Sequence, residues 1–543
     1  MSDAFQKRRL SGKDYFLQRF FEILPGAVSW SMLIGIAVLS FTRPALAVVL
    51  IIAFDFYWLL RLFYLTFFLV IAYVRLSFDA QTDWMARVAE VDAAVRGEAR
   101  GAALSETGFR RRQSFRMHAG RLKELKKTGS APPPSGRIRH LVIIPISKES
   151  REIVEPGLAA LAAQSYPKDR ITVFFALEER AGPEIREAVE GLVRDYRKIF
   201  RDLRCVVHPD GLEGESRVKG ANVTFAAKAA AEYFAAQKIP FEDLIASCFD
   251  ADTVVSPHYM ACLTYHYLVS PQRTRASFQP IPVYHNNLWK VPPFARVLEM
   301  GSSFFQLVEA TNPEKLVTFS SHSMSFKALV EVGYWPVDMI SDDSAIFWKA
   351  LLHYEGDYRV VPMNMTVSMD VVAADTWWQT AKNLYKQKRR WAWGVENFPL
   401  MMRGFIRSRR IPLRTKLQHA VKLFELHLAW ATWGFILSFL SWLPVLLARG
   451  EFSSTVLYYS APRVTAVIWN LAGLGFATTT VISLALLPKD TSPHALRRKL
   501  LFTLEWLATP LVLPFLTAMP ALDAQTRLMF GRYMEFWVTD KKR

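Results

Sequence analysis

The stretch "HLVIIPISKESREIVEPGLAALAAQSYPKDRITVFFALEE", residues 140–179, decides the fold. It begins and ends in short apolar runs rich in β-branched or aromatic residues, which are typical of strands buried in a parallel sheet. The segment between the two runs, "REIVEPGLAALAAQ", has helical spacing, and the alternation continues through "EIREAVEGLVRDYRKIF" to "LRCVVHPD" at 203–210. This order of strands and helices predicts a doubly wound α/β sheet, which binds ligands beyond the carboxyl ends of its strands.

Several classes of protein are excluded by sequence and composition. No G-x-G-x-x-G or G-x-x-x-x-G-K-[ST] follows these strands, which argues against a dinucleotide or P-loop site. The net charge of +18 is that of a nucleic-acid binder or of a membrane protein with basic cytosolic surfaces. Without a helix-turn-helix, zinc-finger or RNP-like signature, we expect no nucleic acid. Cys205, Cys248 and Cys262 show neither zinc spacing nor a disulfide pattern and suit a reducing cytosol.

Long apolar runs lie near the two ends of the chain, which is 51% hydrophobic. The runs 28–41 and 45–74, separated at Arg43-Pro44, predict a helical hairpin whose basic N-terminal flank lies in the cytosol. Asp55 and Arg61 within it are expected near the interface or paired with each other. The runs 424–447 and 464–487 are plausible spans. The run 500–518, broken by Glu505, Pro510 and Pro514, predicts a re-entrant or interfacial segment.

These features divide the chain into regions whose boundaries follow composition. They are an N-terminal transmembrane hairpin (1–76), a cytosolic helical linker (77–136), an α/β domain (137–375), amphipathic interface helices (376–422), C-terminal transmembrane segments (423–520) and a basic tail (521–543).

Two aspartates follow the apolar run of "LIASCFDADTVV". If the chain stays extended, alternation places Asp250 and Asp252 on one side of it, at the ligand-binding edge of the sheet. Mg²⁺ is usually held by one or two carboxylates together with substrate phosphates, so the pair predicts a metal site. The alternative is that this D-x-D is an ordinary surface turn that binds no metal.

A second acidic pair, Asp342 and Asp343, begins the helical pattern of "MISDDSAIFWKALL". Helix capping explains one aspartate, and a general base for a hydroxyl nucleophile explains the other. Lys219 and Asn222, in "RVKGANVTFAAKAA", come just before a helical pattern, where a lysine suits phosphate. An ordinary exposed lysine is nearly as good an interpretation of these residues alone.

The stretch "TWWQTAKNLYKQKRRWAWG" mixes cations with aromatic residues and predicts a helix lying at the membrane surface. A plain anchor explains its lysines and outer tryptophans, but it does not explain the spacing of Gln387, Arg390 and Trp391. We assign these three to the active site and the remainder of the stretch to the interface.

The ordered set D-x-D, an acidic pair before a helix, and Q-x-x-R-W, all between membrane segments, resembles the inverting family 2 membrane glycosyltransferases. Cellulose, hyaluronan and chitin synthases and glucosylceramide synthase belong to this family. The resemblance covers roughly residues 138–410 and the flanking membrane layout. It implies a GT-A fold, Rossmann-like with a mostly parallel sheet, inserted in the cytosol between α-helical transmembrane segments.

The resemblance also implies roles for residues. The catalytic base is Asp343, with Asp342 beside it, because "SDD" stands where the family has T-E-D. Asp250 and Asp252 bind the metal. Gln387, Arg390 and Trp391 serve the acceptor and the diphosphate, with acceptor contacts from the loop that holds Ser321 and His322. The donor-binding residues are Pro145, Glu149, Glu178, Lys219, Asn222 and Asp250.

Two residues in the matching segments depart from the family pattern, and the tail carries one further match. Lys148 stands where asparagine is usual, and Glu178 replaces a shorter aspartate. In the tail, Phe536, Thr539 and Lys541 match the F-x-V-T-x-K gating loop of cellulose synthases. That match predicts a cytosolic tail near the donor diphosphate. A basic tail resting on lipid headgroups is an equal alternative.

We therefore expect a multi-pass glycosyltransferase of the cell (inner or plasma) membrane with a cytosolic catalytic domain. It would use Mg²⁺ or Mn²⁺ and transfer a sugar from a nucleotide-sugar, most simply a UDP-sugar, to a growing polysaccharide. Transfer of a single sugar to a lipid acceptor is the alternative. A transporter is disfavoured, because the membrane part shows no repeat and the largest region is α/β. Membrane lipids are expected partners, and the sequence names no protein partner.

Overall fold

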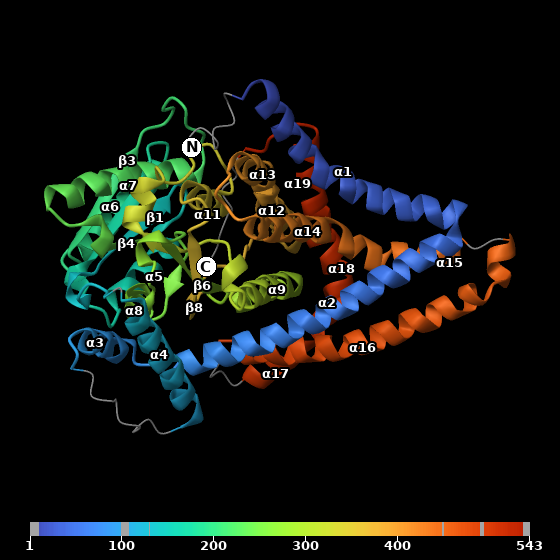
Figure 1. The fold of residues 1–543 in the computed structure, drawn as a ribbon, viewed down its shortest axis with the longest axis horizontal. Coiled ribbons are helices and arrows are strands. Elements are labelled where there is room, and N and C mark those ends of the chain that lie inside the picture. The colour runs from blue at the N-terminus through green and yellow to red at the C-terminus, as the bar shows by residue number, and fades with distance from the viewer. Residues whose placement is uncertain (1–9, 99–107, 130, 448–449, 489–493, 536–543) are drawn as a thin grey trace.

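The computed structural model describes residues 10–98, 108–129, 131–447, 450–488 and 494–535. An α/β domain lies at one end, and the long helices α1, α2 and α16 extend away from it (Figure 1). The helices of the described residues are α1 (Gly12–Thr42), α2 (Pro44–Asp79), α3 (Trp84–Val95), α4 (Phe109–Thr128), α5 (Arg151–Ala162), α6 (Pro183–Tyr196), α7 (Lys219–Ala236), α8 (Tyr259–Val269), α9 (Pro293–Glu309), α10 (Phe326–Glu331), α11 (Asp342–His353), α12 (Trp377–Ala392), α13 (Asn397–Arg407), α14 (Leu413–Ser438), α15 (Leu443–Leu446), α16 (Val456–Leu486), α17 (Ala495–Glu505), α18 (Thr509–Leu513) and α19 (Met519–Met529).

The strands of the described residues form one sheet in the order β3-β2-β1-β4-β7-β6-β8-β5. They are β1 (Arg139–Ile146), β2 (Ile171–Glu178), β3 (Asp202–His208), β4 (Leu244–Cys248), β5 (Val254–Val255), β6 (Ala276–Val283), β7 (Ser323–Ser325) and β8 (Arg359–Ser368). The pairs β1–β2, β1–β4, β2–β3 and β6–β8 are parallel. The predicted mostly parallel α/β sheet is therefore confirmed.

Strand β7 runs against its neighbours β4 and β6, and this reversal positions the site. In the β4–β7 pair, Ser247 lies opposite Ser323. Because the two strands are antiparallel, the residues just before β7 lie beside those just after β4. The loop 318–322 therefore reaches the same edge of the sheet as Asp250.

Successive side chains of β1 and β2 point to opposite faces of the sheet. Helices cover both faces, so each face has its own hydrophobic core. One core joins Val142, Ile144, Val173 and Phe175 to helices α3, α5, α6 and α8. The other joins Leu141, Ile143, Phe174 and Ala176 to helices α7, α10, α11 and α13, and reaches α1. The α/β domain and the first long helix thus share a core.

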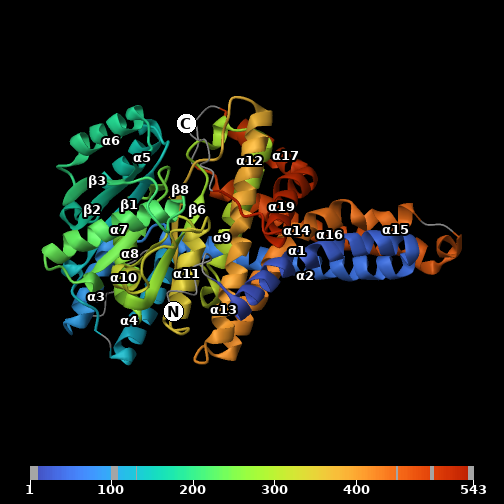
Figure 2. The ribbon, with the colours of Figure 1, turned by 90° about the horizontal axis from the view of Figure 1, so that it is seen from above.

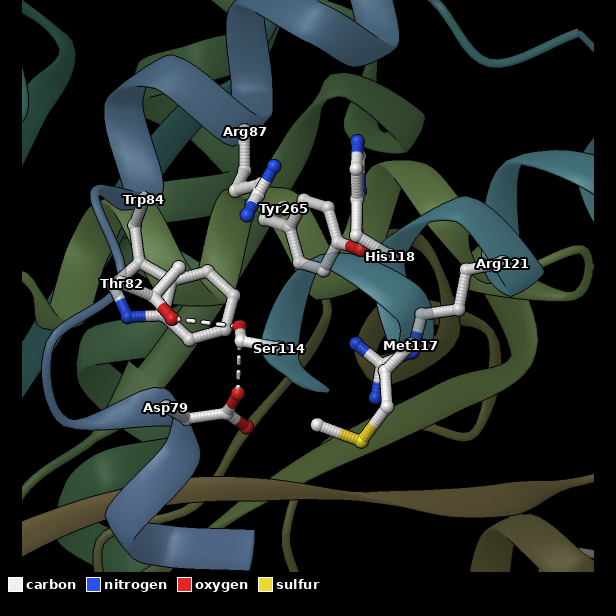
Figure 3. Close-up of a pocket in the computed structure, with 9 residues that line it drawn as sticks. All are labelled: Asp79, Thr82, Trp84, Arg87, Ser114, Met117, His118, Arg121 and Tyr265. Carbon is white, nitrogen blue, oxygen red and sulfur yellow. Dashed lines mark hydrogen bonds between the residues drawn. The ribbon is translucent and has the colours of Figure 1, made fainter. Parts of the chain in front are cut away.

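A polar cluster joins the end of α2 to the α/β domain (Figure 3). Asp79 accepts hydrogen bonds from Ser114 Oγ (3.3 Å) in α4 and from Asn364 Nδ2 (2.9 Å) in β8, and Thr82 Oγ1 lies 2.8 Å from Ser114 Oγ. The small cavity that the cluster lines, about 10 Å³, has room for one water molecule. Its hydrogen-bonding groups therefore anchor α3 and α4 rather than form a ligand site.

Four helical segments of the described residues are long and apolar enough to cross a membrane: 12–42, 44–79, 456–486 and 495–529. α14 with residues 440–446 makes a further pair, bent by 48°. The first segment begins earlier than the predicted run 28–41. Helices α18 and α19 run across the direction of α1, α2 and α16 (Figure 1). The view from above again shows these three long helices extending away from the α/β domain (Figure 2).

The expected pairing of Asp55 with Arg61 is wrong. Arg61 Nη2 lies 3.3 Å from Glu425 Oε1 in α14, and the hydroxyl of Tyr57 donates to the same oxygen (2.7 Å). Asp55 is buried instead. The charge pair therefore joins two helices that are far apart in the sequence.

Candidate active site

The two aspartates that follow β4 lie in a turn, not in an extended segment. The amide of Thr253 donates to the carbonyl of Asp250 (2.9 Å), which closes the turn. The alternation argument for one-sided carboxylates is therefore wrong. Asp250 is half-buried and bonds to Lys219 and Ser320, whereas Asp252 is fully buried and accepts the amide of Asp370 (2.8 Å).

One lysine lies among three carboxylates at this edge of the sheet. Lys219 Nζ is 2.7 Å from both carboxylate oxygens of Asp343, 3.1 Å from Asp250 Oδ1 and 3.6 Å from Asp342 Oδ2. The lysine and the Asp342–Asp343 pair are the first residues of α7 and α11, and these helices begin side by side. The structure thus brings together the predicted lysine, the acidic pair and the first residue of the D-x-D.

The close approach of α7 and α11 depends on Gly220. A Cβ atom at this position would lie 2.2 Å from the carbonyl oxygen of Pro336 and 3.0 Å from Cβ of Asp342. Only glycine permits this spacing without movement of the backbone. The glycine therefore allows Lys219 to reach the carboxylates.

Burial sets the charge states of the cluster. Burial raises the pKa of Asp342 to about 8, the nearby carboxylates add to the rise, and Lys219 opposes it. Burial alone would lower the pKa of Lys219, but Asp250, Asp342 and Asp343 together raise it well above its usual value. Near neutral pH, Asp342 therefore carries a proton and Lys219 stays charged.

The loop before β7 supports both aspartate groups. Ser320 donates to Asp250 Oδ2, Thr318 Oγ1 donates to the backbone carbonyl of Asp343 (2.6 Å), and Ser321 Oγ lies 2.7 Å from Thr253 Oγ1. Ser321 has a positive φ of 60°, an uncommon conformation for a residue with a side chain. Sequence reasoning missed Thr318 and Ser320, although both lie in the loop that it singled out.

Ser321 and His322, predicted to meet the acceptor, are fully buried. His322 Nδ1 lies 3.0 Å from the carbonyl of Phe319 and 3.9 Å from Asp343 Oδ1. Burial lowers the pKa of His322, so its ring is neutral at pH 7. These two side chains hold the loop and the acidic turn in place, and neither is exposed to an acceptor.

Glu396, which follows α12, binds the backbone just before the acidic pair. Its Oε1 accepts hydrogen bonds from the amides of Ile340 (3.2 Å) and Ser341 (3.1 Å) and from Ser341 Oγ (2.8 Å). Asn397 Nδ2 adds bonds to Ser341 Oγ (3.1 Å) and Ser344 Oγ (2.9 Å). The residues after α12 thus fix the start of α11, which no sequence pattern indicated.

Helix α12 brings Arg390 within electrostatic reach of the acidic cluster and Trp391 to the loop before β7. The charge of Arg390 acts on the carboxyl of Asp342, lowering its pKa against the effect of burial. Gln387 is buried. The Trp391 ring meets the ring of Phe319 edge-on, with 5.7 Å between the centroids, and lies 6.1 Å from the ring of Tyr284.

The remainder of α12 is not simply an interface. Arg389 Nη1 donates to Asp523 Oδ2 in α19 (2.8 Å), as does the hydroxyl of Tyr385 (3.2 Å), and Lys388 is fully buried. Trp377 and Trp378 are exposed, as a surface helix requires. The structure therefore gives Arg389 and Tyr385 a partner that the sequence did not indicate, because Asp523 lies more than 130 residues away in the sequence.

The predicted donor-side residues line the neighbouring strand ends. Glu178 accepts from Ser147 Oγ (3.1 Å) and from Arg180, and Glu149 Oε2 accepts the amides of Ser147 (2.8 Å) and Lys148 (3.0 Å). A cavity of about 150 Å³ opens beside Glu178, between Arg180, His208 and the loop 209–218. That loop leads directly to Lys219.

Pro145 and Asn222 are buried and contact the sheet. Pro145 is paired with Ala176 inside the sheet, and Asn222 Nδ2 donates to the carbonyl of Ala176 (2.7 Å). Both residues are buried, and Asn222 ties α7 to β2. The gating residues Phe536, Thr539 and Lys541 lie outside the described residues.

The fold and the site together define a class of protein. It is an α/β domain with an acid-rich site at the carboxyl edge of its sheet, closed by a helix that carries cations and tryptophan, and attached to long apolar helices. Comparison with known proteins agrees with this class.

Residues 247–482 match the family model described as "Glycosyl transferase family group 2". This segment includes Asp250, Asp252, Asp342, Asp343 and the Gln387–Trp391 stretch. The segment that is similar to this family therefore contains both acidic pairs and the Q-x-x-R-W stretch.

Among characterised relatives, the chain is similar to the poly-β-1,6-N-acetyl-D-glucosamine synthase of Staphylococcus aureus (strain COL). The two are 31% identical over 177 residues, which are 31% of this chain and 39% of the relative. The chain thus spans well under half the length of the curated relatives it matches. The matches support a glycosyltransferase.

Two solved structures are also similar. The mannosyltransferase PcManGT of Pyrobaculum calidifontis, solved with GDP-Man and Mn²⁺, is 16% identical with a TM-score of 0.39, covering 72% of this chain and 99% of its own. S. aureus TarS 1–349 with UDP-GlcNAc is 14% identical with a TM-score of 0.34, covering 74% of this chain and 95% of its own.

Proposed function

We propose that this chain is a membrane-embedded inverting glycosyltransferase that transfers a sugar from a nucleotide-sugar, a UDP-sugar in the simplest case, to a growing polysaccharide. The observation that carries the proposal is the cluster of Asp250, Asp342 and Asp343 around Lys219. The three aspartates lie within the segment that matches glycosyltransferase family group 2. Such a cluster supplies a base, a cation and metal-binding oxygens at one edge of a sheet.

Asp343 is the proposed general base. Its carboxylate accepts hydrogen bonds from Lys219 at 2.7 Å, whereas Asp342 is buried and protonated near pH 7. An acceptor hydroxyl is a poor nucleophile until a base takes its proton. Asp343 takes that proton as the hydroxyl oxygen attacks the anomeric carbon, the bond to the diphosphate breaks, and a single displacement inverts the anomeric centre.

Asp250 and Asp252 fit a divalent metal through the chemistry of their donor set. Carboxylate oxygens are the ligands that Mg²⁺ and Mn²⁺ prefer. Within the described part of the chain, no group of three or more His, Cys, Asp or Glu side chains could hold a metal by itself. The other ligands would therefore be substrate phosphates and water, which is usual for Mg²⁺. When bound, the ion neutralises charge on the diphosphate.

The departing nucleoside diphosphate gains negative charge, and two cations of this chain are placed to stabilise it. Lys219 lies at the N-terminus of α7, where backbone amides also favour anions. Arg390 lies across the cluster on α12, within electrostatic reach of Asp342. Fixed charges in a site of this kind stabilise developing charge without reorganisation.

The donor's nucleoside is proposed to occupy the cavity beside Glu178, and the acceptor to rest on Trp391. The apolar helices support a position of this site beside a membrane, and the proposed arrangement has α1, α2, α14 and α16 as spans and the α/β domain in the cytosol. The name of the S. aureus relative makes UDP-N-acetylglucosamine the first donor to test and a β-1,6-linked polymer the first product to look for.

The test is transfer by the purified full chain in detergent or nanodiscs, with a panel of nucleotide-sugars and either Mg²⁺ or Mn²⁺. We expect one donor to give a polymer, and Asp343→Asn to lower the rate at least about 100-fold while UDP binding persists. A product that partitions into organic solvent would indicate a lipid acceptor. Turnover of Asp343→Asn near the wild-type rate would contradict the assignment of Asp343 as the general base.

A further inference from the structure

A buried ion pair lies directly beneath the ring of Trp391. Lys388 Nζ is 3.7 Å from the centroid of this ring, 2.9 Å from Glu299 Oε2 and 2.9 Å from Ser302 Oγ. These contacts account for the three N–H groups of the ammonium. The side chains of Lys388 and Glu299 are 2% and 1% exposed, so the pair is withdrawn from water.

Stability alone does not explain this arrangement. Replacing a buried ion pair by apolar side chains of similar volume is often neutral or stabilising, because both charges must be desolvated. A cation over an indole face, in contrast, fixes the ring relative to the element that holds the cation, and it is strongest when water is excluded. The feature that the pair controls is therefore the plane of Trp391.

The remaining contacts of the ring agree with this role. Phe319 meets the ring edge-on and Tyr284 lies beside it, so its neighbours are aromatic. Glu299 and Ser302 belong to α9, which is anchored a second time where Arg296 pairs with Glu505 of α17. The ammonium is thus held by a helix that is also tied to α17.

We propose that Lys388, held by Glu299 and Ser302, is a positioning residue that sets the plane of Trp391 for stacking against a pyranose ring of the acceptor. Lys388 occupies one of the two unspecified positions of Q-x-x-R-W, so the motif gives no sign of its role. The proposal rests on the proposed function, because it takes the acceptor to be a carbohydrate chain.

The test compares Lys388→Met, Glu299→Met and the double variant with wild type. A matched control is Lys382→Met, because Lys382 Nζ lies 5.1 Å from the ring of the exposed Trp378 on the same helix. The acceptor is a soluble oligosaccharide of the wild-type product, a β-1,6-linked N-acetylglucosamine pentamer if UDP-N-acetylglucosamine is the donor. Acceptor KM, kcat, UDP affinity with Mn²⁺ and melting temperature are measured for each.

We expect Lys388→Met to raise the acceptor KM about tenfold and to leave UDP affinity within about twofold. The single variants should melt at lower temperature, because each leaves one buried group without its partner. The double variant should regain the melting temperature but not the acceptor KM, and Lys382→Met should resemble wild type.

Recovery of the acceptor KM in the double variant would overturn the proposal, because the pair would then be only structural. Equal loss of UDP affinity and acceptor affinity would overturn it as well. Absence of wild-type transfer counts instead against the proposed function. In that case, calorimetry of the pentamer without donor decides: weaker binding by Lys388→Met supports positioning, and equal or absent binding overturns it.

Discussion

At the scale of single residues, the site is organised by an imbalance of charge. One ammonium, Lys219, contacts three carboxyl groups, and the charge of Arg390 on α12 also acts on Asp342. Two aspartates that are adjacent in the sequence thereby acquire different roles. Asp342 is buried and keeps a proton near pH 7, whereas Asp343 is half-buried and both of its carboxylate oxygens accept hydrogen bonds from the lysine. Different surroundings can give two neighbouring carboxyl groups different parts in acid–base chemistry.

The raised pKa of Asp342 predicts a pH-dependent stability. An unfolded chain releases this proton near pH 4, whereas the folded chain keeps it until about pH 8. Between these values the folded state binds the extra proton, so this group lowers stability as pH rises from about 4 to about 8. Asp342→Asn removes the effect. Its melting temperature relative to wild type should therefore increase from pH 5 to pH 8.5, measured in EDTA without donor.

The control for this measurement is Glu314→Gln, a change at an exposed carboxylate outside the site. Its melting temperature relative to wild type should vary little across the same range. A difference between Asp342→Asn and wild type that does not depend on pH would contradict the assignment of a proton to Asp342.

The sequence indicated Asp250, Asp342, Asp343 and Lys219, because carboxylates and a lysine at strand ends and helix starts are visible in a linear pattern. It did not indicate Ser320 or Glu396, which act through hydrogen bonds to residues distant in the chain. It did not indicate that Ser321 and His322 are buried, because a motif position does not reveal whether a side chain points into the core.

At the scale of elements, two helix N-termini and one loop form the site. Helices α7 and α11 begin against each other, and the antiparallel strand β7 brings the loop 318–322 alongside the turn that follows β4. The alternation of apolar runs predicted the parallel strands β1, β2 and β3. It did not predict the reversal at β7, because a strand of only three residues carries no periodic signal.

Gly220→Ala tests the contact between α7 and α11. The added methyl group would meet the carbonyl of Pro336 at 2.2 Å, so the start of α7 must shift and carry Lys219 away from Asp343. We expect a loss of about 1–3 kcal/mol of stability and a fall in transfer rate of more than about tenfold. Thermal melting and initial rates measure the two effects.

A matched control is Gly301→Ala in α9, where nothing lies within 4 Å of the added atom. Alanine is the better helix former, so this variant should be as stable as wild type or up to about 1 kcal/mol more stable. If the two variants behaved alike, the close contact at Gly220 would not be what fixes Lys219.

At the scale of the whole molecule, the C-terminal apolar segment connects the site to the long helices. Asp523 of α19 binds Arg389 and Tyr385 of α12, and Gln525 of the same helix bonds to Ser29 of α1 (2.7 Å) and to the carbonyl of His427 in α14 (2.7 Å). Toward the end of the described chain, the hydroxyl of Tyr533 donates to Glu22 near the start of α1. A chain end tied to the N-terminal part of α1 is expected on the same side of a membrane as residue 22.

Residues 495–529 are apolar enough to span a membrane, and they could either cross it or lie in its surface. Helices α18 and α19 run across the long helices (Figure 1), and the leucines at positions 496, 500, 504, 507 and 511 form an exposed row with helical spacing. Such a row suits a helix that lies in the membrane surface with its apolar face toward lipid. We therefore predict that this segment does not cross, and that Arg43 and Glu535 face opposite sides.

Single cysteines test this topology in a Cys205→Ser background, since Cys248 and Cys262 are buried. An impermeant thiol reagent added to intact cells should label Arg43→Cys, in the turn between α1 and α2. It should label Glu535→Cys only after the membrane is permeabilised. Labelling of Glu535→Cys from outside would show that residues 495–529 cross the membrane. The tail with Thr539 and Lys541 would then face away from the nucleotide, which would also rule out a gating role for it.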